Sequence, residues 1–257
     1  MGKAARLKRE RALTRAKPVA PPRHAVALPP LAIALGLAVV LAALSIGFIE
    51  SARPAPPPSA LANRAEVTRA YAGIPQHGTV LGRARAPVTM VVYVDPQCPY
   101  CGEWERGAMP ELVARYVRPG ALRVVVRGLH FVGADSERAL RLLDASAMQD
   151  RFFQAAALLY WNQGEENTGW VTDGYLRALA YSVGASDPQR LLADRATPDV
   201  DAKMRADGQA ALRDGVVSTP WIELGRTGGR LRHVELTQLD AAAVAPLIRR
   251  LAGESTS

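Results

Sequence analysis

The order of hydrophobic and polar positions predicts alternating strands and helices. Residues 88–94 (V-T-M-V-V-Y-V) are apolar on both faces, as expected of a strand buried in the middle of a sheet. Helical spacing begins at Cys98 and continues to about Val117, before Pro119-Gly120 ends it. Because proline lacks a backbone N–H and clashes with the preceding turn, Pro110 is expected to kink or break this helix.

The rest of the pattern predicts a helical block between two halves of one sheet. The later segments are strands at 122–126, 216–224 and 231–236, a helical stretch at about 136–214, and a closing amphipathic helix at 239–251. Asp187-Pro188 and Thr197-Pro198 each predict a helix start, and Gly184 and Gly215 predict helix ends. This order favours an α/β fold with a helical insertion between two halves of a sheet.

A long uncharged run near the N-terminus predicts one transmembrane helix at 31–49. As a helix these 19 residues rise about 28 Å, close to the hydrocarbon thickness of a bilayer. A cleaved signal peptide would have a shorter basic region and a shorter apolar core, although 45–47 or 50–52 could act as a weak cleavage site. We favour a retained anchor over a cleaved peptide, and both over a buried core helix.

Charge is concentrated at the N-terminus. The net charge is +8, and residues 1–30 carry eight Lys or Arg against Glu10 alone, which gives +7 and leaves about +1 for the other 227 residues. A nearly neutral main domain argues against nucleic-acid binding. Basic flanks stay in the cytoplasm, so we expect 1–30 to be a cytoplasmic tail and the C-terminal domain to be extracytoplasmic at the cell membrane.

A Pro-rich linker is predicted between the anchor and the domain. Residues 51–59 contain four prolines and favour a semi-rigid spacer, within a linker that we place at 50–72. A short helix at 60–71 is compatible with the pattern. The domain itself is expected at 73–254.

The chain has two cysteines, Cys98 and Cys101, separated by Pro99 and Tyr100 at the predicted start of a helix. The free N–H groups and the positive end of the helix dipole stabilise a thiolate there, and a thiolate is the reactive species in disulfide exchange. We therefore assign Cys98 as the nucleophile and Cys101 as the resolving thiol. Since Pro99 and Tyr100 add no positive charge, a mild oxidant is expected.

Two other interpretations of this pair carry less weight. A zinc site needs two further ligands, and His77, His130 and His233 show no paired spacing, so we expect no metal. A purely structural disulfide across so short a loop would add little stability. No cofactor is expected beyond the redox-active Cys98–Cys101 disulfide.

Several motifs together resemble the DsbA-type branch of the thioredoxin superfamily, in particular its membrane-tethered members. They are G-I-P-Q at 73–76, A-P-V-T at 86–89, D-P-Q-C-P-Y-C at 95–101, N-Q-G-E-E-N-T-G-W at 162–170 and S-T-P at 218–220. The resemblance covers about residues 73–252 in the expected order.

This resemblance implies a thioredoxin-like fold with a helical insertion at roughly 133–214 and a cis Thr219–Pro220 bond facing the dithiol. It also implies a groove for unfolded, cysteine-containing exported proteins, to which Thr219, Pro220 and Trp221 would contribute. Reoxidation would come from a quinone-linked membrane partner of the DsbB or VKOR kind. Of the other aromatic residues, Trp104 and Trp161 are expected in the core.

One position departs from the family pattern. Relatives usually carry a buried acid six residues before the first cysteine, where this chain has Val92. Proton transfer at Cys101 would then use water, Glu103 or Glu223, with Asp95 expected in the loop.

Three functions remain open on sequence. The leading one is an oxidase that donates its disulfide to exported proteins. The alternatives are a disulfide isomerase or reductase, although residues 50–72 are short for a dimerisation domain, and a non-catalytic binding module. The reduction potential depends on the relative stability of the two redox forms, which the sequence does not determine.

Overall fold

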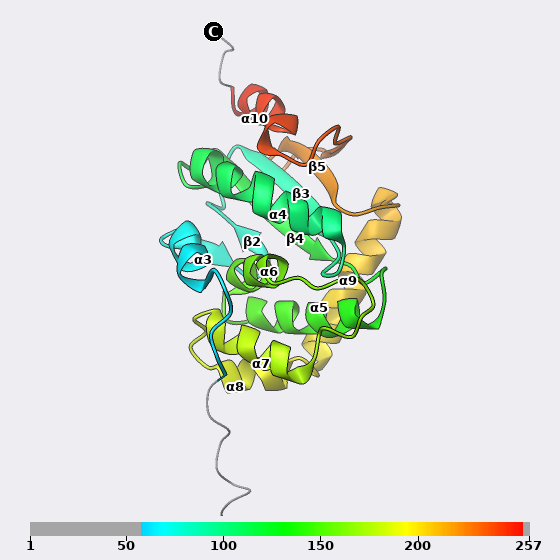
Figure 1. Ribbon diagram of the computed structural model, residues 1–257. Helices are drawn as coiled ribbons and strands as arrows, with labels where there is room; N and C mark the ends of the chain where they lie inside the picture. Colours follow the sequence, from blue (N-terminus) through cyan, green and yellow to red (C-terminus); the bar gives the residue numbers. More distant parts are fainter. Residues whose placement is uncertain (1–57, 254–257) are drawn as a thin grey trace, which may run out of the picture. The chain divides into compact units, whose positions relative to one another are not determined.

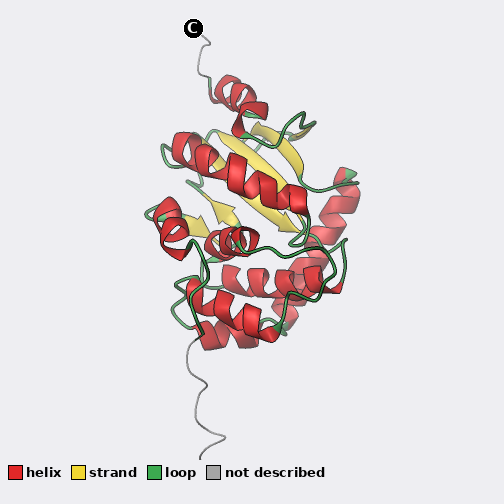
Figure 2. Cartoon of the chain, viewed as in Figure 1, coloured by secondary structure: helices red, strands yellow, loops and turns green. Residues whose placement is uncertain are grey.

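The computed structural model describes residues 58–253, which form a six-stranded sheet with helices around it (Figures 1 and 2). The strands lie in the order β1-β2-β4-β3-β5-β6. Their bounds are β1 Gln76–His77, β2 Val80–Leu81, β3 Val88–Val94, β4 Leu122–Gly128, β5 Trp221–Arg226 and β6 Arg232–Val234. β3 and β4 run parallel, whereas the other neighbouring pairs are antiparallel.

Strand β3 is the buried central strand that the sequence predicts. All seven of its residues are buried, because β4 and β5 flank it and helices pack on its two faces. Val92 pairs with Val126 on one side and Ile222 on the other. The chain leaves β3 directly into the segment that carries the two cysteines, so the rigid centre of the sheet positions them.

The helices form two groups (Figure 1). Their bounds are α3 Arg64–Tyr71, α4 Pro99–Leu112, α5 Ala134–Ala147, α6 Phe152–Trp161, α7 Asp173–Ser182, α8 Pro188–Asp194, α9 Pro198–Asp214 and α10 Ala245–Ala252. Helices α4 and α10 cover one face of the sheet, and α5 to α9 form the insertion between β4 and β5. The end of α9 reaches the opposite face, where Ala210 and Ala211 pack against Val91 and Tyr93.

The sequence predicts a kink or break of the helix at Pro110, and the break is wrong. Helix α4 continues through Pro110 to Leu112 and passes into a π-helical turn, η1 Val113–Val117. A proline inside a helix costs about 3 kcal/mol, whereas burying Met109, Leu112 and Val113 contributes roughly 5–9 kcal/mol in total. Core packing therefore outweighs the lost backbone hydrogen bond.

Element boundaries differ elsewhere from the sequence pattern. Strand β5 begins at Trp221 and not at 216, because the preceding residues form the loop with a cis Thr219–Pro220 bond. The closing helix is divided into η2 Ala241–Ala243 and α10. Helix α3 lies inside the stretch expected as linker, and its Val67 and Tyr71 are buried in the main core. The helix ends expected at Gly184 and Gly215 are present, each with φ of 70°.

The predicted basic tail 1–30 and transmembrane helix 31–49 lie outside the described residues, as do most of the Pro-rich spacer and residue 254. Between residues 58 and 253, none of the helices is both long and apolar enough to cross a bilayer.

Candidate active site

The two cysteines lie where β3 meets α4. Cys98 is the N-cap residue of α4, and its backbone N–H donates to the Asp95 carbonyl at 3.1 Å, which closes a tight turn after the strand. Pro99 takes the first helical position, where a missing N–H costs nothing. Both thiols are free, Cys101 is fully buried, and Tyr100 between them is 62% exposed. The dithiol thus lies buried at a helix N-terminus, with Cys98 6% exposed, next to the exposed Tyr100.

The Cys98 thiol is strongly acidified. Its pKa falls from 9.0 to about 6, chiefly because the Cys101 thiol donates a hydrogen bond to the Cys98 sulfur. The Thr219 side chain and the backbone N–H groups of Cys101 and Tyr100 lower the pKa further, against the opposing effect of burial. Cys98 is therefore mostly thiolate at neutral pH, as its position at the helix start predicts.

The Cys101 thiol is shifted the other way. Burial raises its pKa well above the ordinary value, and the adjacent Cys98 sulfur adds to the effect. A thiol that stays protonated cannot initiate exchange. The asymmetry between the two sulfurs agrees with the roles expected for Cys98 and Cys101.

The loop before β5 contacts the dithiol although it lies 121 positions away in sequence. The Cys98 sulfur lies 3.3 Å from the Thr219 carbonyl oxygen, to which it donates a hydrogen bond only when it is protonated, and the Thr219–Pro220 bond is cis. The tertiary fold thus brings Cys98, Thr219 and Pro220 together. The Trp221 side chain belongs instead to the smaller hydrophobic cluster with Tyr93, and its ring stacks on His233 at 3.5 Å.

A buried polar network holds the loop between β3 and α4. Asp95 is fully buried, and its carboxylate accepts hydrogen bonds from the Gln97 N–H at 2.8 Å, the Ser136 hydroxyl at 2.6 Å and the Val132 N–H at 3.0 Å. Three donors satisfy a charge that would otherwise be costly to bury. Sequence reasoning placed Asp95 in the loop but missed this network, because Ser136 and Val132 follow β4.

The loop between α6 and α7 also binds the active-site segment. The Asn167 N–H donates to Gln97 Oε1 at 2.7 Å, and Gln163 Nε2 donates to the carbonyls of Pro96 at 3.0 Å and Cys98 at 3.1 Å. These residues belong to the 162–170 motif, which carried the family resemblance but no assigned role. Only the order of the motifs pointed to them.

Only one of the two tryptophans expected in the core is buried there. Trp104 is 1% exposed and lies in the core, as predicted. The core assignment of Trp161 is wrong, because it is 37% exposed at the last position of α6, beside a small hollow that Glu105 and Tyr71 also line. Phe131, which the sequence did not single out, is 59% exposed in the loop that Asp95 holds through the neighbouring Val132.

No acid replaces the expected one on β3, where Val92 is buried in the main core. Glu103 is exposed, and Glu223 lies on the sheet face opposite α4. Glu105 lies one helical turn after Cys101, where its carboxylate accepts a hydrogen bond from Tyr71 at 2.8 Å. Burial raises the pKa of Glu105 to about 7. Glu105 follows Cys101 by four residues, and this spacing could have indicated that the two side chains lie on the same side of α4.

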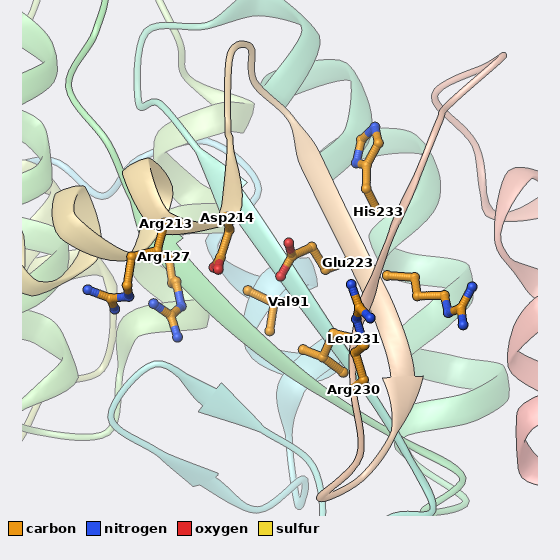
Figure 3. A pocket seen from close by; sticks show the side chains of 9 residues that line it. Val91, Arg127, Arg213, Asp214, Glu223, Arg230, Leu231 and His233 are labelled. Carbon is orange, nitrogen blue, oxygen red and sulfur yellow. The ribbon is translucent and has the colours of Figure 1, made fainter.

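A large hollow elsewhere in the described part of the chain does not contain the dithiol. It has a volume of about 810 Å³ and lies on the other sheet face, beside β5 and β6. Figure 3 shows Asp214 and Glu223 in its middle, with Arg127 and Arg213 on one side and Arg230 on the other. Arg232 also lines the hollow, so four arginines face two acids and the hollow has an excess of positive charge. Its lining residue His233 stacks on Trp221.

Comparison with a family model gives a match to the family described as thioredoxin over residues 76–228, more than half of the chain. Among curated proteins, a probable disulfide bond formation protein D of Bacillus cereus is 26% identical over 143 residues, covering 54% of this chain and 66% of that protein. The corresponding Bacillus anthracis protein is 25% identical over 165 residues, covering 63% of this chain and 75% of its own length.

The chain is also similar in fold to solved structures. Oxidised BdbD from Bacillus subtilis superimposes with a TM-score of 0.60 at 21% identity, covering 68% of this chain and 93% of that one. DsbA2 from Pseudomonas aeruginosa gives a TM-score of 0.53 at 22% identity, covering 72% of this chain and 100% of that one.

Proposed function

This chain belongs to the thioredoxin family and is a thiol-disulfide oxidoreductase of the DsbA type, and from this we propose that it donates its Cys98–Cys101 disulfide to exported proteins. The predicted α/β thioredoxin-like fold with a helical insertion is confirmed. The observation that carries the proposal is the asymmetry of the two thiols, with the pKa of Cys98 near 6 and that of Cys101 raised.

The proposed exchange proceeds in two steps. A substrate thiolate attacks the Cys98 sulfur of the oxidised protein, and the S–S bond breaks with its electron pair on Cys101, which takes up a proton. A second substrate thiolate then attacks the substrate sulfur of the mixed disulfide, and Cys98 leaves as a thiolate. The substrate loses two electrons and gains a disulfide, while the protein becomes a dithiol. A low pKa makes Cys98 a good leaving group and favours oxidation of the substrate.

The surface beside Cys98 supports a polypeptide substrate. The Thr219 carbonyl lies 3.3 Å from the sulfur, and Pro220 follows it across the cis bond. Tyr100, Phe131 and Val217 are exposed apolar residues on three segments tied to the dithiol. Val217 is 84% exposed, two residues before Thr219. Exposed apolar groups of this kind suit an unfolded chain, and we propose Thr219 and Pro220 as substrate-binding residues. Trp221 stays a weaker candidate because it stacks on His233.

The proposal includes compartment and partners. A basic tail and an apolar run of bilayer length favour a single-pass membrane protein with its domain outside the cytoplasm. After each turnover the dithiol needs an electron acceptor, and we propose a DsbB- or VKOR-like membrane quinone reductase. The disulfide itself accepts the two electrons from the substrate, so the proposed reaction uses no other cofactor or metal, and it involves no nucleic acid.

The test mixes purified oxidised protein with a reduced, unfolded test protein and follows disulfide formation. We expect stoichiometric oxidation, with a scrambled substrate tested in parallel. Unscrambling with negligible oxidation would replace the oxidase by an isomerase, and inactivity in both assays would favour a binding module. In Cys101→Ser the Cys98 thiolate should attack a disulfide of the scrambled substrate and displace one substrate thiol. The mixed disulfide should then accumulate, because no second thiol of the protein can resolve it. Cys98→Ser is the matched control and should accumulate no mixed disulfide. If Cys98→Ser alone trapped substrate, the assigned roles of Cys98 and Cys101 would be reversed.

A further inference from the structure

The loop between α6 and α7 contacts the active-site backbone through one side chain. Gln163 Nε2 donates to two carbonyls, that of Pro96 at 3.0 Å and that of Cys98 at 3.1 Å. Gln163 lies 65 positions after Cys98, so neither contact follows from local sequence. The two carbonyls bracket the turn that leads into α4, which makes the Gln163 amide a bridge across that turn.

Gly102 provides the space for this bridge. A Cβ atom at position 102 would lie 2.3 Å from Gln163 Oε1, far closer than Cβ atoms in proteins approach non-bonded neighbours. Gly102 is buried in the first turn of α4, and its N–H donates to the same Cys98 carbonyl at 3.1 Å. Glycine is unfavourable inside a helix, where alanine would be preferred. The close approach of Gln163 accounts for glycine at this position.

A second contact fixes the same loop. The Asn167 N–H donates to Gln97 Oε1 at 2.7 Å, and Gln97 Nε2 donates to the Ser136 hydroxyl at 3.0 Å. Gln97 is 1% exposed, so this contact is shielded from water. The insertion therefore holds both the side chain before Cys98 and the backbone around it.

We propose that Gln163 is a positioning residue for the dithiol, which fixes the Pro96–Cys98 turn so that the Cys98 sulfur stays over the first-turn N–H groups of α4. The N–H groups of Tyr100 and Cys101 act on the sulfur only while this geometry is kept. Without Gln163 the turn loosens and the Pro96 carbonyl loses its donor. The inference rests on the proposed function only in treating Cys98 as the reactive thiol.

The test titrates the thiolate of the reduced protein by its ultraviolet absorbance in wild type, Gln163→Ala, Gly102→Ala and the double variant. One net hydrogen bond corresponds to a rise in the pKa of Cys98 of about 0.5 to 1. We expect this rise in each single variant, since the methyl group that Gly102→Ala introduces displaces the Gln163 amide. The double variant should rise no further, because both changes remove one interaction.

Two control variants isolate the bridge. A Cβ at position 102 also approaches Arg106, so Arg106→Ala should leave the titration unchanged if Gln163 is the relevant neighbour. Gly208→Ala places a methyl group on a helical glycine with open space around it and should also have no effect. An Arg106→Ala shift equal to that of Gly102→Ala would overturn the inference.

An unchanged pKa in folded Gln163→Ala, or shifts that add in the double variant, would overturn it as well. If Gln163→Ala does not fold, Gln163→Met keeps the side-chain length, removes both N–H donors without adding a charge and should raise the pKa of Cys98. An unchanged pKa in that variant would equally contradict the inference. The titration needs no substrate. An active oxidase with an unchanged titration sinks only this inference, whereas an inactive protein with the expected shift sinks only the proposed function.

Discussion

Lowering the pH should destabilise the reduced protein relative to the oxidised protein, because only the reduced form carries the Cys98 thiolate. In the folded state the pKa of Cys98 is about 6, against an ordinary value of 9.0 that applies to the unfolded chain. A group with a lowered folded pKa stabilises the protein when ionised. Its contribution is complete above the unfolded pKa and is lost as the pH falls through the folded pKa.

The size of the effect follows from these two values. Between about pH 7 and pH 5 the folded thiol changes from roughly 90% to roughly 10% ionised, which removes about 1.3 kcal/mol of stability. Solvent next to the exposed Tyr100 screens part of this, so we expect about 1 kcal/mol. Cys101 adds nothing in this range because its raised pKa keeps it protonated in both states.

The assay is urea unfolding of the reduced and oxidised proteins at about pH 5, 6 and 7, with reduced Cys98→Ser as the control. Groups such as Glu105 titrate in both redox forms and cancel in the difference. A reduced-minus-oxidised difference that stays constant across this range, or one that persists in Cys98→Ser, would refute the assigned thiolate. The same proton balance predicts that the reduction potential falls by about 30 mV per pH unit above pH 6 and about 59 mV below it.

Three further substitutions test other parts of the site and core. Asp95→Asn should cost about 3 kcal/mol of unfolding free energy, because an amide cannot accept all three hydrogen bonds of the carboxylate; a loss below about 1 kcal/mol would contradict the network. Tyr100→His, once protonated, should raise the reduction potential by roughly 10–20 mV through an exposed charge beside the thiolate, measured against glutathione, and a lower potential would be contrary. Burial raises the pKa of Asp144 from 3.8 to about 7, and neither of its oxygens has a hydrogen-bond partner among the described residues. A raised pKa in the folded state costs stability as the pH rises from 4 through 7. Asp144→Asn should therefore stabilise the protein at about pH 8 by up to roughly 4 kcal/mol and leave its stability unchanged near pH 4. Urea unfolding at the two pH values measures this.

Features that depend on neighbouring residues could be predicted from the sequence. A continuous apolar run predicts β3, and cysteine followed by proline predicts a helix start with an acidified thiol, because strand burial and helix termini are local properties. The helix ends at Gly184 and Gly215 follow for the same reason, since glycine adopts positive φ at low cost. The order of the motifs was enough to predict the fold.

Features that depend on how distant segments pack could not be predicted in this way. Pro110 lies inside a helix and Trp161 lies at the surface, because the fit of each helix against its neighbours decides both. The bridge from Gln163 to the Cys98 carbonyl joins segments 65 positions apart, and it exists only because Gly102 leaves room for it. Sequence therefore determined which thiol lies at the start of a helix. The tertiary structure decided what holds that thiol in place, because hydrogen bonds between remote segments form only once the chain has packed.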